Sequence, residues 1–171
     1  ERLGARPPRP TVRLQELKPV RVAGPGHAPS YSGHYFTGGS QAPQRDRNNR
    51  GEPLRVRREV FGEGWGVHAP NQMVYELQPR FARFVALAGA DDQIHDDRHG
   101  ANRARYPSLV FRVLVDGSEL ARSPVMRPGE PAWRFDVALP AGGRWLSLVT
   151  TDAGDGNRED LGNWVEAGFL E

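Results

Sequence analysis

The chain has 171 residues, of which 37% are hydrophobic and 26% are charged, and it contains 20 Gly, 15 Pro and no Cys. That length is enough for one domain with its own hydrophobic core, and the high content of Gly and Pro is typical of a loop-rich β protein. The lack of cysteine excludes disulfides, zinc–thiolate sites and thiol nucleophiles. No window of about 18 apolar residues occurs, so no membrane-spanning helix is predicted.

Basic residues gather in the first third of the chain, although the formal net charge is only +2. Residues 1–21 carry six basic and two acidic side chains, and residues 45–59 carry six and three. Neither cluster has aromatic residues among its arginines, and no motif that reads nucleic acid occurs. We therefore expect no nucleic-acid partner.

The N-terminal third predicts a linker, a strand and a long loop. Residues 1–10 are rich in Pro and Arg and are expected to form an extended linker, so a single domain is predicted over residues 11–171. Apolar residues over Val12–Val22 indicate an entering strand. Residues 24–51 are poor in apolar residues and are expected to form a long loop, which Tyr31, Tyr35 and Phe36 would pin to the surface of the domain.

From Pro53 onward the apolar residues occur in short runs, which is the pattern of β-strands. Strands are predicted from Leu54, Val56 and Val60, and over Gln72–Leu77, Phe81–Leu87, Ser108–Asp116, Trp133–Leu139, Arg144–Thr151 and Asn163–Leu170. No segment has a convincing 3.6-residue periodicity. The sequence therefore predicts an all-β fold, namely an antiparallel β-sandwich or jelly roll.

Three local features of these strands predict their positions and orientations. The run Phe81–Leu87 is apolar on both faces, which favours a central strand. Asp116-Gly117 is a dipeptide typical of two-residue hairpins, because both positions tolerate positive φ. Alternation over residues 133–139 directs Trp133, Phe135 and Val137 into the core.

The segment Thr151–Asp160 contains the densest group of oxygen-bearing side chains. Asp152, Asp155 and Asp160 are the candidate metal ligands, and Gly154 and Gly156 free the backbone to turn its carbonyls inward. Such a donor set suits calcium, although the spacing is not that of an EF-hand. The alternative is a solvated loop held by Asx turns.

A second acidic segment follows the predicted central strand. Asp91 and Asp92 stand at its end, where either carboxylate would reach the acidic loop or a ligand. His95 and His99 are four residues apart, which on a helix would suit zinc, but the polar, glycine-flanked run indicates a loop. No third zinc ligand is identified.

Trp65 and His68 occur in the glycine-rich segment Gly62–Asn71, which is predicted to form a bend. A flat indole on a loop is a platform for the apolar face of a sugar ring, and planar polar groups nearby would bind its hydroxyls. The alternative is a Trp packed against the end of the sandwich. No nucleophile elbow, phosphate loop, HExxH motif or nominated pair of carboxylates occurs, so no enzyme activity is expected.

Ordered landmarks over about the last 120 residues resemble the NPCBM domain, also classed as carbohydrate-binding module family 51. They are Gln44–Asn49, Gly64–Asn71, Tyr75–Leu77, Ala90–Asp92, Val110–Gly117 and Val149–Asn157, followed by Asp160 and Trp164. The resemblance implies a galactose-binding-domain-like jelly roll with a structural calcium. It also implies a site for galactose-containing glycans and attachment to glycoside hydrolases or other secreted bacterial proteins.

The chain departs from the family pattern at several positions. Trp65 replaces a small aliphatic residue, Asp160-Leu161 replaces an acidic–His pair, and Asn163 replaces an Asp. The loops over Gly24–Ala42 and Gln93–Pro107 are longer than usual, and longer loops on a rigid sandwich commonly alter a binding site.

The expected function is that of a non-catalytic carbohydrate-binding module. The predicted contacts to sugar are Trp65, His68, Asp91, Asp92 and Asn157. The domain is expected to be linked covalently to other domains of an extracellular, periplasmic or cell-surface bacterial protein. The alternative is a structural or protein-interaction sandwich whose sugar site is no longer used.

Overall fold

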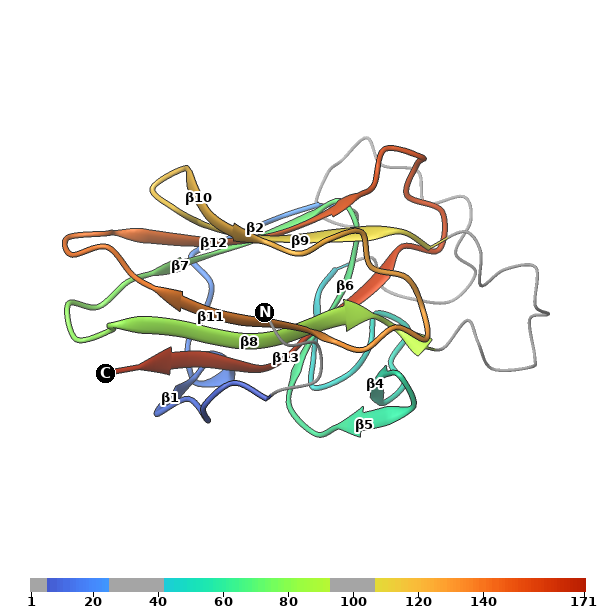
Figure 1. The fold of residues 1–171 in the computed structure, drawn as a ribbon, viewed down its shortest axis with the longest axis horizontal. Coiled ribbons are helices and arrows are strands. Elements are labelled where there is room, and N and C mark those ends of the chain that lie inside the picture. The colour runs from blue at the N-terminus through green and yellow to red at the C-terminus, as the bar shows by residue number, and fades with distance from the viewer. Residues whose placement is uncertain (1–5, 25–41, 93–106) are drawn as a thin grey trace.

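The computed structural model of the chain describes residues 6–24, 42–92 and 107–171 (Figure 1). Short antiparallel strands make up nearly all of its regular structure. In chain order they are β1 (Val12–Arg13), β2 (Arg21–Ala23), β3 (Gln44–Arg45), β4 (Leu54–Val56), β5 (Glu59–Phe61), β6 (Gly64–His68), β7 (Asn71–Glu76), β8 (Arg83–Ala90), β9 (Leu109–Val115), β10 (Ser118–Arg122), β11 (Trp133–Ala138), β12 (Trp145–Asp152) and β13 (Leu161–Leu170), and a 3-10 helix, η1 (Leu14–Glu16), follows β1.

Two antiparallel sheets lie face to face and form the body of the domain (Figure 1). One sheet has the order β11-β8-β13-β6-β3, with β1 paired to β13, and the other has the order β10-β9-β12-β7-β2. Strand β8 lies between β11 and β13, so the prediction of a central strand at Phe81–Leu87 is confirmed, with its bounds shifted toward Ala90. The predicted antiparallel β-sandwich is likewise confirmed.

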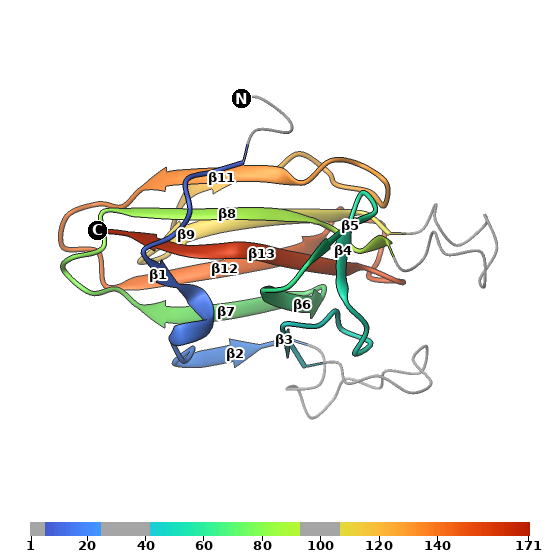
Figure 2. The ribbon, with the colours of Figure 1, turned by 90° about the horizontal axis from the view of Figure 1, so that it is seen from below.

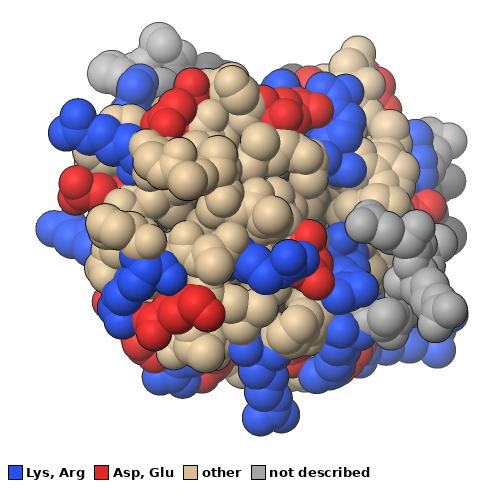
Figure 3. Space-filling model, turned by 60° about the vertical axis from the view of Figure 1, so that its left-hand side comes forward, with Lys and Arg blue, Asp and Glu red and all other residues tan. Residues whose placement is uncertain are grey.

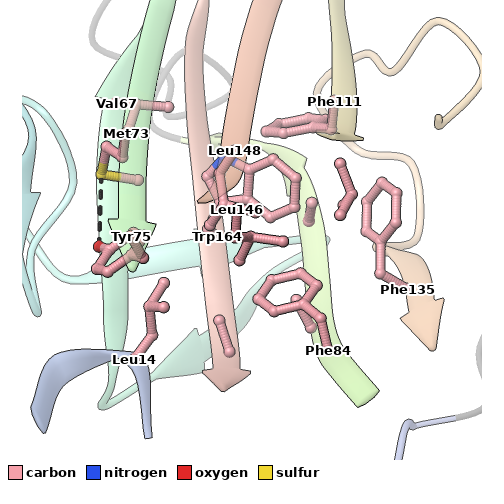
Figure 4. Close-up of a cluster of buried hydrophobic side chains, with 14 of the residues drawn as sticks. Leu14, Val67, Met73, Tyr75, Phe84, Phe111, Phe135, Leu146, Leu148 and Trp164 are labelled. Carbon is pink, nitrogen blue, oxygen red and sulfur yellow. Dashed lines mark hydrogen bonds between the residues drawn. The ribbon is translucent and has the colours of Figure 1, made fainter. Parts of the chain in front are cut away.

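Trp164 of β13 lies in the core between the sheets and is fully buried (Figure 4). Phe111 and Phe135 lie with their ring centroids 5.2 Å from the Trp164 ring. The indole N–H donates a hydrogen bond of 3.1 Å to Thr150 Oγ1 of the facing sheet, so burial leaves this donor satisfied. Trp164 therefore connects the two sheets through both apolar and polar contacts.

The hairpin and the inward-facing residues of β11 follow the predictions. Asp116 and Gly117 have φ values of 49° and 82°, and they connect β9 to β10. On β11, Phe135 is buried, whereas Trp133 and Val137 are half-buried and pack against the same core. Trp133 and Val137 stay partly exposed because β11 is the outermost strand of its sheet and no further strand of the described residues covers them.

Two local predictions are wrong. Leu54, Val56 and Val60 do not share one strand, because β4 and β5 are separate strands of a small hairpin, in which Val60 is 59% exposed. The expected bend at Gly62–Asn71 is largely strand, since β6 pairs with β13 along Gly64–His68. Alternation did not reveal β6 because two of its outward positions are glycines, which provide no polar or apolar signal.

A third layer, formed by residues 46–61, covers part of the outer face of the β13 sheet (Figure 2). Leu54, Val56 and Phe61 of this outer layer pack on Leu87 and Val165 of the sheet. The backbone approaches the sheet closely: a Cβ on Gly66 would lie 2.3 Å from Arg47 O, and one on Gly89 would lie 2.5 Å from Val56 Cγ1. Glycine at these positions therefore allows the outer layer to dock.

The N-terminal segment lies against this outer layer. Arg6 forms ion pairs with Glu59 of β5 and Glu166 of β13, and Thr11 N–H donates to Phe169 O over 2.9 Å. The part of the predicted linker that the structure describes, residues 6–10, thus contacts the domain. Tyr31, Tyr35, Phe36, His95 and His99 lie outside the described residues.

Many of the arginines form surface ion pairs with acidic side chains. Figure 3 shows one face on which Lys and Arg alternate with Asp and Glu around an uncharged area. Pairs such as Arg80–Glu171 and Arg83–Asp136 are typical of this surface. In the described ranges, no helix is long and apolar enough to cross a membrane.

Candidate functional site

Most of the predicted site residues meet at one end of the sandwich, on the right in Figure 1. His68 is the last residue of β6, Asp91 and Asp92 follow β8, and Asn157 lies in the β12–β13 connection. That connection also contains Asp155 and Asp160, and the third candidate metal ligand, Asp152, is the last residue of β12. Four of the five predicted sugar contacts are thus brought to the same end by strands that are neighbours in the sheet.

The backbone register explains this meeting. Strand β13 lies between β6 and β8, and its first residue, Leu161, pairs with His68. On the other side of β13, Asp91 N–H donates to Leu161 O over 2.9 Å. Neighbouring strands lie about 4.8 Å apart, so the backbones of His68 and Asp91 are roughly 10 Å apart.

Asp91 is 1% exposed and is surrounded by protein donors. Its carboxylate accepts hydrogen bonds from Asn163 Nδ2 at 2.6 Å, from Asn48 Nδ2 at 3.2 Å and from the Arg55 backbone N–H at 3.4 Å. Because Asn48 and Arg55 belong to the outer layer, Asp91 ties that layer to the sheet.

Asp92 has a similar role one residue further along. Its carboxylate accepts hydrogen bonds from the backbone N–H groups of Arg58 and Gly129, the latter at 3.0 Å. Asp92 is 7% exposed, so it is buried. Both predicted carboxylates therefore bind backbone and amide groups that shape the site.

His68 is fully buried, and its Nδ1–H donates to Ala69 O over 2.6 Å. Burial, with a smaller contribution from the nearby charge of Arg50, lowers the pKa of His68 to about 4. The imidazole is therefore neutral at physiological pH. The bond from Nδ1 selects the tautomer in which Nε2 carries no proton.

Arg50 and Glu159 are functional candidates that sequence reasoning missed. Arg50 Nη2 forms a hydrogen-bonded ion pair with Glu159 Oε2, and their side chains are 20% and 8% exposed. Glu159 has a φ of 60°, which turns the backbone at this point. In the sequence, Glu159 lies within the acidic segment and Arg50 directly follows the Gln44–Asn49 landmark. The two residues are far apart in the chain, so no motif predicts that they pair.

Asp160 is the best buried of the candidate metal ligands. Its Oδ1 accepts a hydrogen bond of 2.9 Å from Ser108 N–H, and the Ser108 hydroxyl donates to Asp155 Oδ1 over 2.6 Å. Asp160 Oδ2 is buried and has no hydrogen-bond partner. Burial, together with the charges of Asp155 and Asp152, raises the pKa of Asp160 to about 8.

The acidic loop provides some, but not all, of the ligands that a cation site needs. A buried carboxylate oxygen without a donor, beside two further carboxylates, is an arrangement that a hard cation would stabilise. In the part of the chain that the structure describes, no three His, Asp or Glu side chains are grouped so as to hold a metal ion by themselves. Backbone carbonyls or water would have to complete the ligand set.

Trp65 lies apart from the other predicted sugar contacts. It pairs with Trp164 across β6 and β13, is half-buried and packs against the core between the sheets. Because it is three residues from His68 on the same strand, its side chain points to the opposite face. The local structure thus matches the packing alternative, and the expected loop-borne platform is not formed.

An antiparallel sandwich with planar polar side chains gathered at one end is an architecture of carbohydrate-binding modules. The family model of the NPCBM/NEW2 domain matches residues 30–170. The chain belongs to this family.

Solved structures of similar domains agree in fold. One of them is CBM51-2 of Clostridium perfringens ZmpB, which was solved with INT domains and in complex with GlcNAc. It is 26% identical to this chain, with a TM-score of 0.72, and the match covers 92% of this chain and 31% of that chain. CBM51 of Clostridium perfringens GH95, in complex with methyl-galactose, is 23% identical with a TM-score of 0.70, over 93% and 99% of the two chains.

The curated relatives are much longer proteins. A candidate endo-alpha-N-acetylgalactosaminidase of Renibacterium salmoninarum is 29% identical over 130 residues, which are 76% of this chain and 8% of that protein. Alpha-1,3-galactosidase B of Akkermansia muciniphila is 26% identical over 123 residues, 71% of this chain and 14% of that protein. The chain thus spans a small part of each relative.

Proposed function

We propose that the end of the sandwich formed by Arg50, His68, Asn157 and Glu159 binds a sugar of a galactose-containing glycan. The observation that carries this proposal is the Arg50–Glu159 ion pair beside the neutral, buried His68. The paired guanidinium and carboxylate can donate to and accept from adjacent sugar hydroxyls. Asp91 and Asp92 would act indirectly, by holding the outer layer that positions Arg50.

Galactose is proposed as the sugar because the methyl-galactose complex of the GH95 module has the same fold. GlcNAc is the second candidate, since the ZmpB module was solved with that sugar. Isothermal titration of the chain with methyl-galactose and with GlcNAc separates the two. Single-sugar sites of this kind bind in the millimolar to micromolar range, about 4 to 8 kcal/mol.

We also propose that Asp160, Asp155 and Asp152 contribute to a structural calcium site. The orphaned Oδ2 of Asp160 and its raised pKa support this proposal. Bound calcium would neutralise the acidic loop and so stabilise the β12–β13 connection that carries Asn157 and Glu159. The sugar would contact protein side chains and not the calcium ion.

In its full-length protein the domain would act as an accessory module. Binding the glycan would raise the local concentration of a linked glycoside hydrolase at its substrate, without catalysis by the module itself. The curated relatives that contain a similar segment support such a linkage. An extracellular, periplasmic or cell-surface location is part of the same proposal. If neither sugar binds to the folded chain, the proposed function fails and the alternative of a structural or protein-interaction domain is favoured.

A further inference from the structure

The N-terminal segment over residues 6–13, called the strap from here on, runs across the outer face of the β13 sheet (Figure 2). Its far end joins that sheet, because Val12 pairs with Phe169. The fit there is close: a Cβ on Gly168 would lie 2.2 Å from Val12 O and 2.6 Å from Pro10 Cβ. The far end of the strap is therefore anchored where a glycine of β13 leaves room for it.

Two arginines of the strap hold β5 at both of its ends. Arg6 forms ion pairs with Glu59, the first residue of β5, and with Glu166 of β13, the latter at 2.8 Å. Arg13 Nη1 donates to Glu63, two residues after β5, over 2.5 Å. These five side chains are each at least 35% exposed. Exposed ion pairs contribute little to stability, so these contacts can open at small cost.

Cavities lie beneath both the strap and the hairpin that it holds. A cavity of about 330 Å³ is lined by residues 7–10 of the strap and by Gly62 and Glu63 of the turn before β6. A second cavity, of about 220 Å³, is lined by Arg6, by residues of the β4–β5 hairpin and by Leu87 of the sheet. Close packing is what normally fixes one layer on another. The strap and the hairpin therefore have room to move at these places.

The other side of the hairpin is bound to the sugar-binding end. The Arg55 N–H of β4 donates to Asp91 Oδ2 over 3.4 Å. Asn48 Nδ2 donates to the other oxygen of Asp91 over 3.2 Å, and Asn48 Oδ1 accepts from the Arg50 N–H over 3.0 Å. Asp91 thus links the hairpin to the segment that carries Arg50, so a shift of the hairpin would be passed on to Arg50.

We propose that the strap regulates the sugar-binding end by docking on β5 and by releasing it. In the docked state, Arg6 and Arg13 fix β5, and the hairpin holds Asp91 and Arg50 in place. In the released state, the hairpin shifts over its cavity and Arg50 is no longer held against Glu159. A domain attached on the N-terminal side releases the strap when its position draws the linker away.

The regulation of sugar binding rests on the proposed function, whereas the coupling between the strap and the hairpin does not. If docking of the strap raises the affinity for sugar, bound sugar must stabilise the docked strap by the same factor. The strap and the sugar site can therefore be tested from both directions.

The test compares two double variants that lose the same charge. Arg6→Gln with Arg13→Gln, the strap variant, removes both contacts to β5. Arg9→Gln with Arg21→Gln is the matched control, because these two arginines are exposed and form no ion pair with any residue that the structure describes. Amide hydrogen exchange of the ¹⁵N-labelled proteins is followed by NMR.

The N–H groups of Arg55 and Arg58, which donate to the two buried carboxylates, report on the hairpin. We expect both to exchange at least five-fold faster in the strap variant than in the wild type or the control. The Phe111 N–H, which donates to Ser123 Oγ in the opposite sheet, should exchange at the same rate in all three proteins. That pattern distinguishes local loosening of the hairpin from unfolding of the whole domain.

Isothermal titration with methyl-galactose measures the effect on the site. The Kd of the strap variant should be at least three-fold higher than that of the wild type, and the Kd of the control should be unchanged. In the reverse direction, saturating methyl-galactose should slow the exchange of the Arg55 and Arg58 amides in the wild type, because it stabilises the docked state.

Equal exchange of the Arg55 and Arg58 amides in the strap variant and the control would overturn the inference, because the hairpin would not depend on the strap. Faster exchange with an unchanged Kd would overturn the regulation of the sugar site. A wild-type chain that binds neither methyl-galactose nor GlcNAc refutes the proposed function and, with it, the regulation of sugar binding. The exchange rates still decide in that case whether the strap holds the hairpin.

Discussion

Arg50 and Glu159 form an ion pair across 109 positions of the chain, and this pair joins the outer layer to the β12–β13 connection. Both side chains are largely buried, so each restricts the orientation of the other. Breaking a partly buried pair leaves one charge without its partner, which costs more than the loss of an exposed surface pair. The pair therefore supports both the shape and the polarity of the candidate site.

Glu159→Gln keeps the size of the side chain but removes its charge. We expect the Kd for methyl-galactose to rise at least ten-fold, which corresponds to about 1.4 kcal/mol, because one hydroxyl acceptor and the orientation of Arg50 are lost. Isothermal titration measures this change. The matched control is Glu171→Gln, since Glu171 also pairs with an arginine but lies at the C-terminus. Equal affinities of the Glu159 variant and the wild type would remove Glu159 from the site.

Calcium is expected to stabilise the chain through Asp160. A cation that binds only the folded state adds about 2.7 kcal/mol at a hundred-fold excess over its Kd, so the melting temperature should rise by several degrees above that in chelator. Magnesium at the same concentration should have little effect, because its small octahedral shell suits this loop poorly.

Asp160→Asn provides the decisive comparison for that prediction. The amide oxygen can still accept the hydrogen bond from Ser108 N–H, but the buried charge is gone. In chelator at pH 8 the variant should melt above the wild type, and calcium should no longer raise its melting temperature. Identical wild-type melting curves with and without chelator, in protein shown by elemental analysis to be metal-free, would contradict the site.

The low pKa of His68 predicts a loss of stability in mild acid. Its folded pKa of about 4 lies below the ordinary value of 6.5, so the unfolded state takes up a proton first as the pH falls. The contribution of His68 is intact above pH 6.5 and declines from there to pH 4, by up to about 3 kcal/mol.

His68→Gln isolates this effect from other titrating groups. Urea unfolding of both proteins between pH 4 and pH 7.5 should show that the stability of the wild type relative to the variant decreases as the pH falls. The raised pKa of Asp160 acts in the opposite direction, but it is common to both proteins and cancels in the difference. A difference that does not change with pH would mean that His68 is accessible to protons in the fold.

Gly66→Ala should disturb the outer layer, because the new Cβ would meet the backbone of Arg47 and Asn48 at 2.3 to 2.5 Å. We expect a loss of about 1 to 3 kcal/mol in stability, together with weaker sugar binding, since Asn48 and Arg50 would move. Gly62→Ala is the control, as nothing lies within 4 Å of its Cβ. Urea unfolding and sugar titration of both variants check the prediction, which fails if they behave alike.

Trp65→Ala distinguishes packing from sugar stacking. The indole packs on the core between the sheets, so its removal should cost about 3 to 5 kcal/mol of stability. The Kd for methyl-galactose in the folded fraction should stay within two-fold of the wild type. A large loss of affinity in protein that is still folded would restore Trp65 as a sugar contact.

Local patterns in the sequence determined the fold class and several elements of this protein. Alternation predicted β11 and the inward direction of Phe135, and the dipeptide Asp116-Gly117 predicted the hairpin between β9 and β10. These features depend on the period of a strand and on the φ values that two residues tolerate, which are properties of neighbouring positions. The family resemblance likewise followed from landmarks that are local in the chain.

Only the tertiary structure decided which polar residues meet and in which role. Asp91 and Asp92 were predicted as sugar contacts, but the outer layer covers them and supplies their hydrogen-bond donors. Trp65 occupies the core face because β6 pairs with β13, a pairing hidden by its glycines. Arg50 reaches Glu159 because the outer layer crosses the sheet at that point. A contact between distant segments depends on register and layer packing, which no spacing within a single sequence specifies.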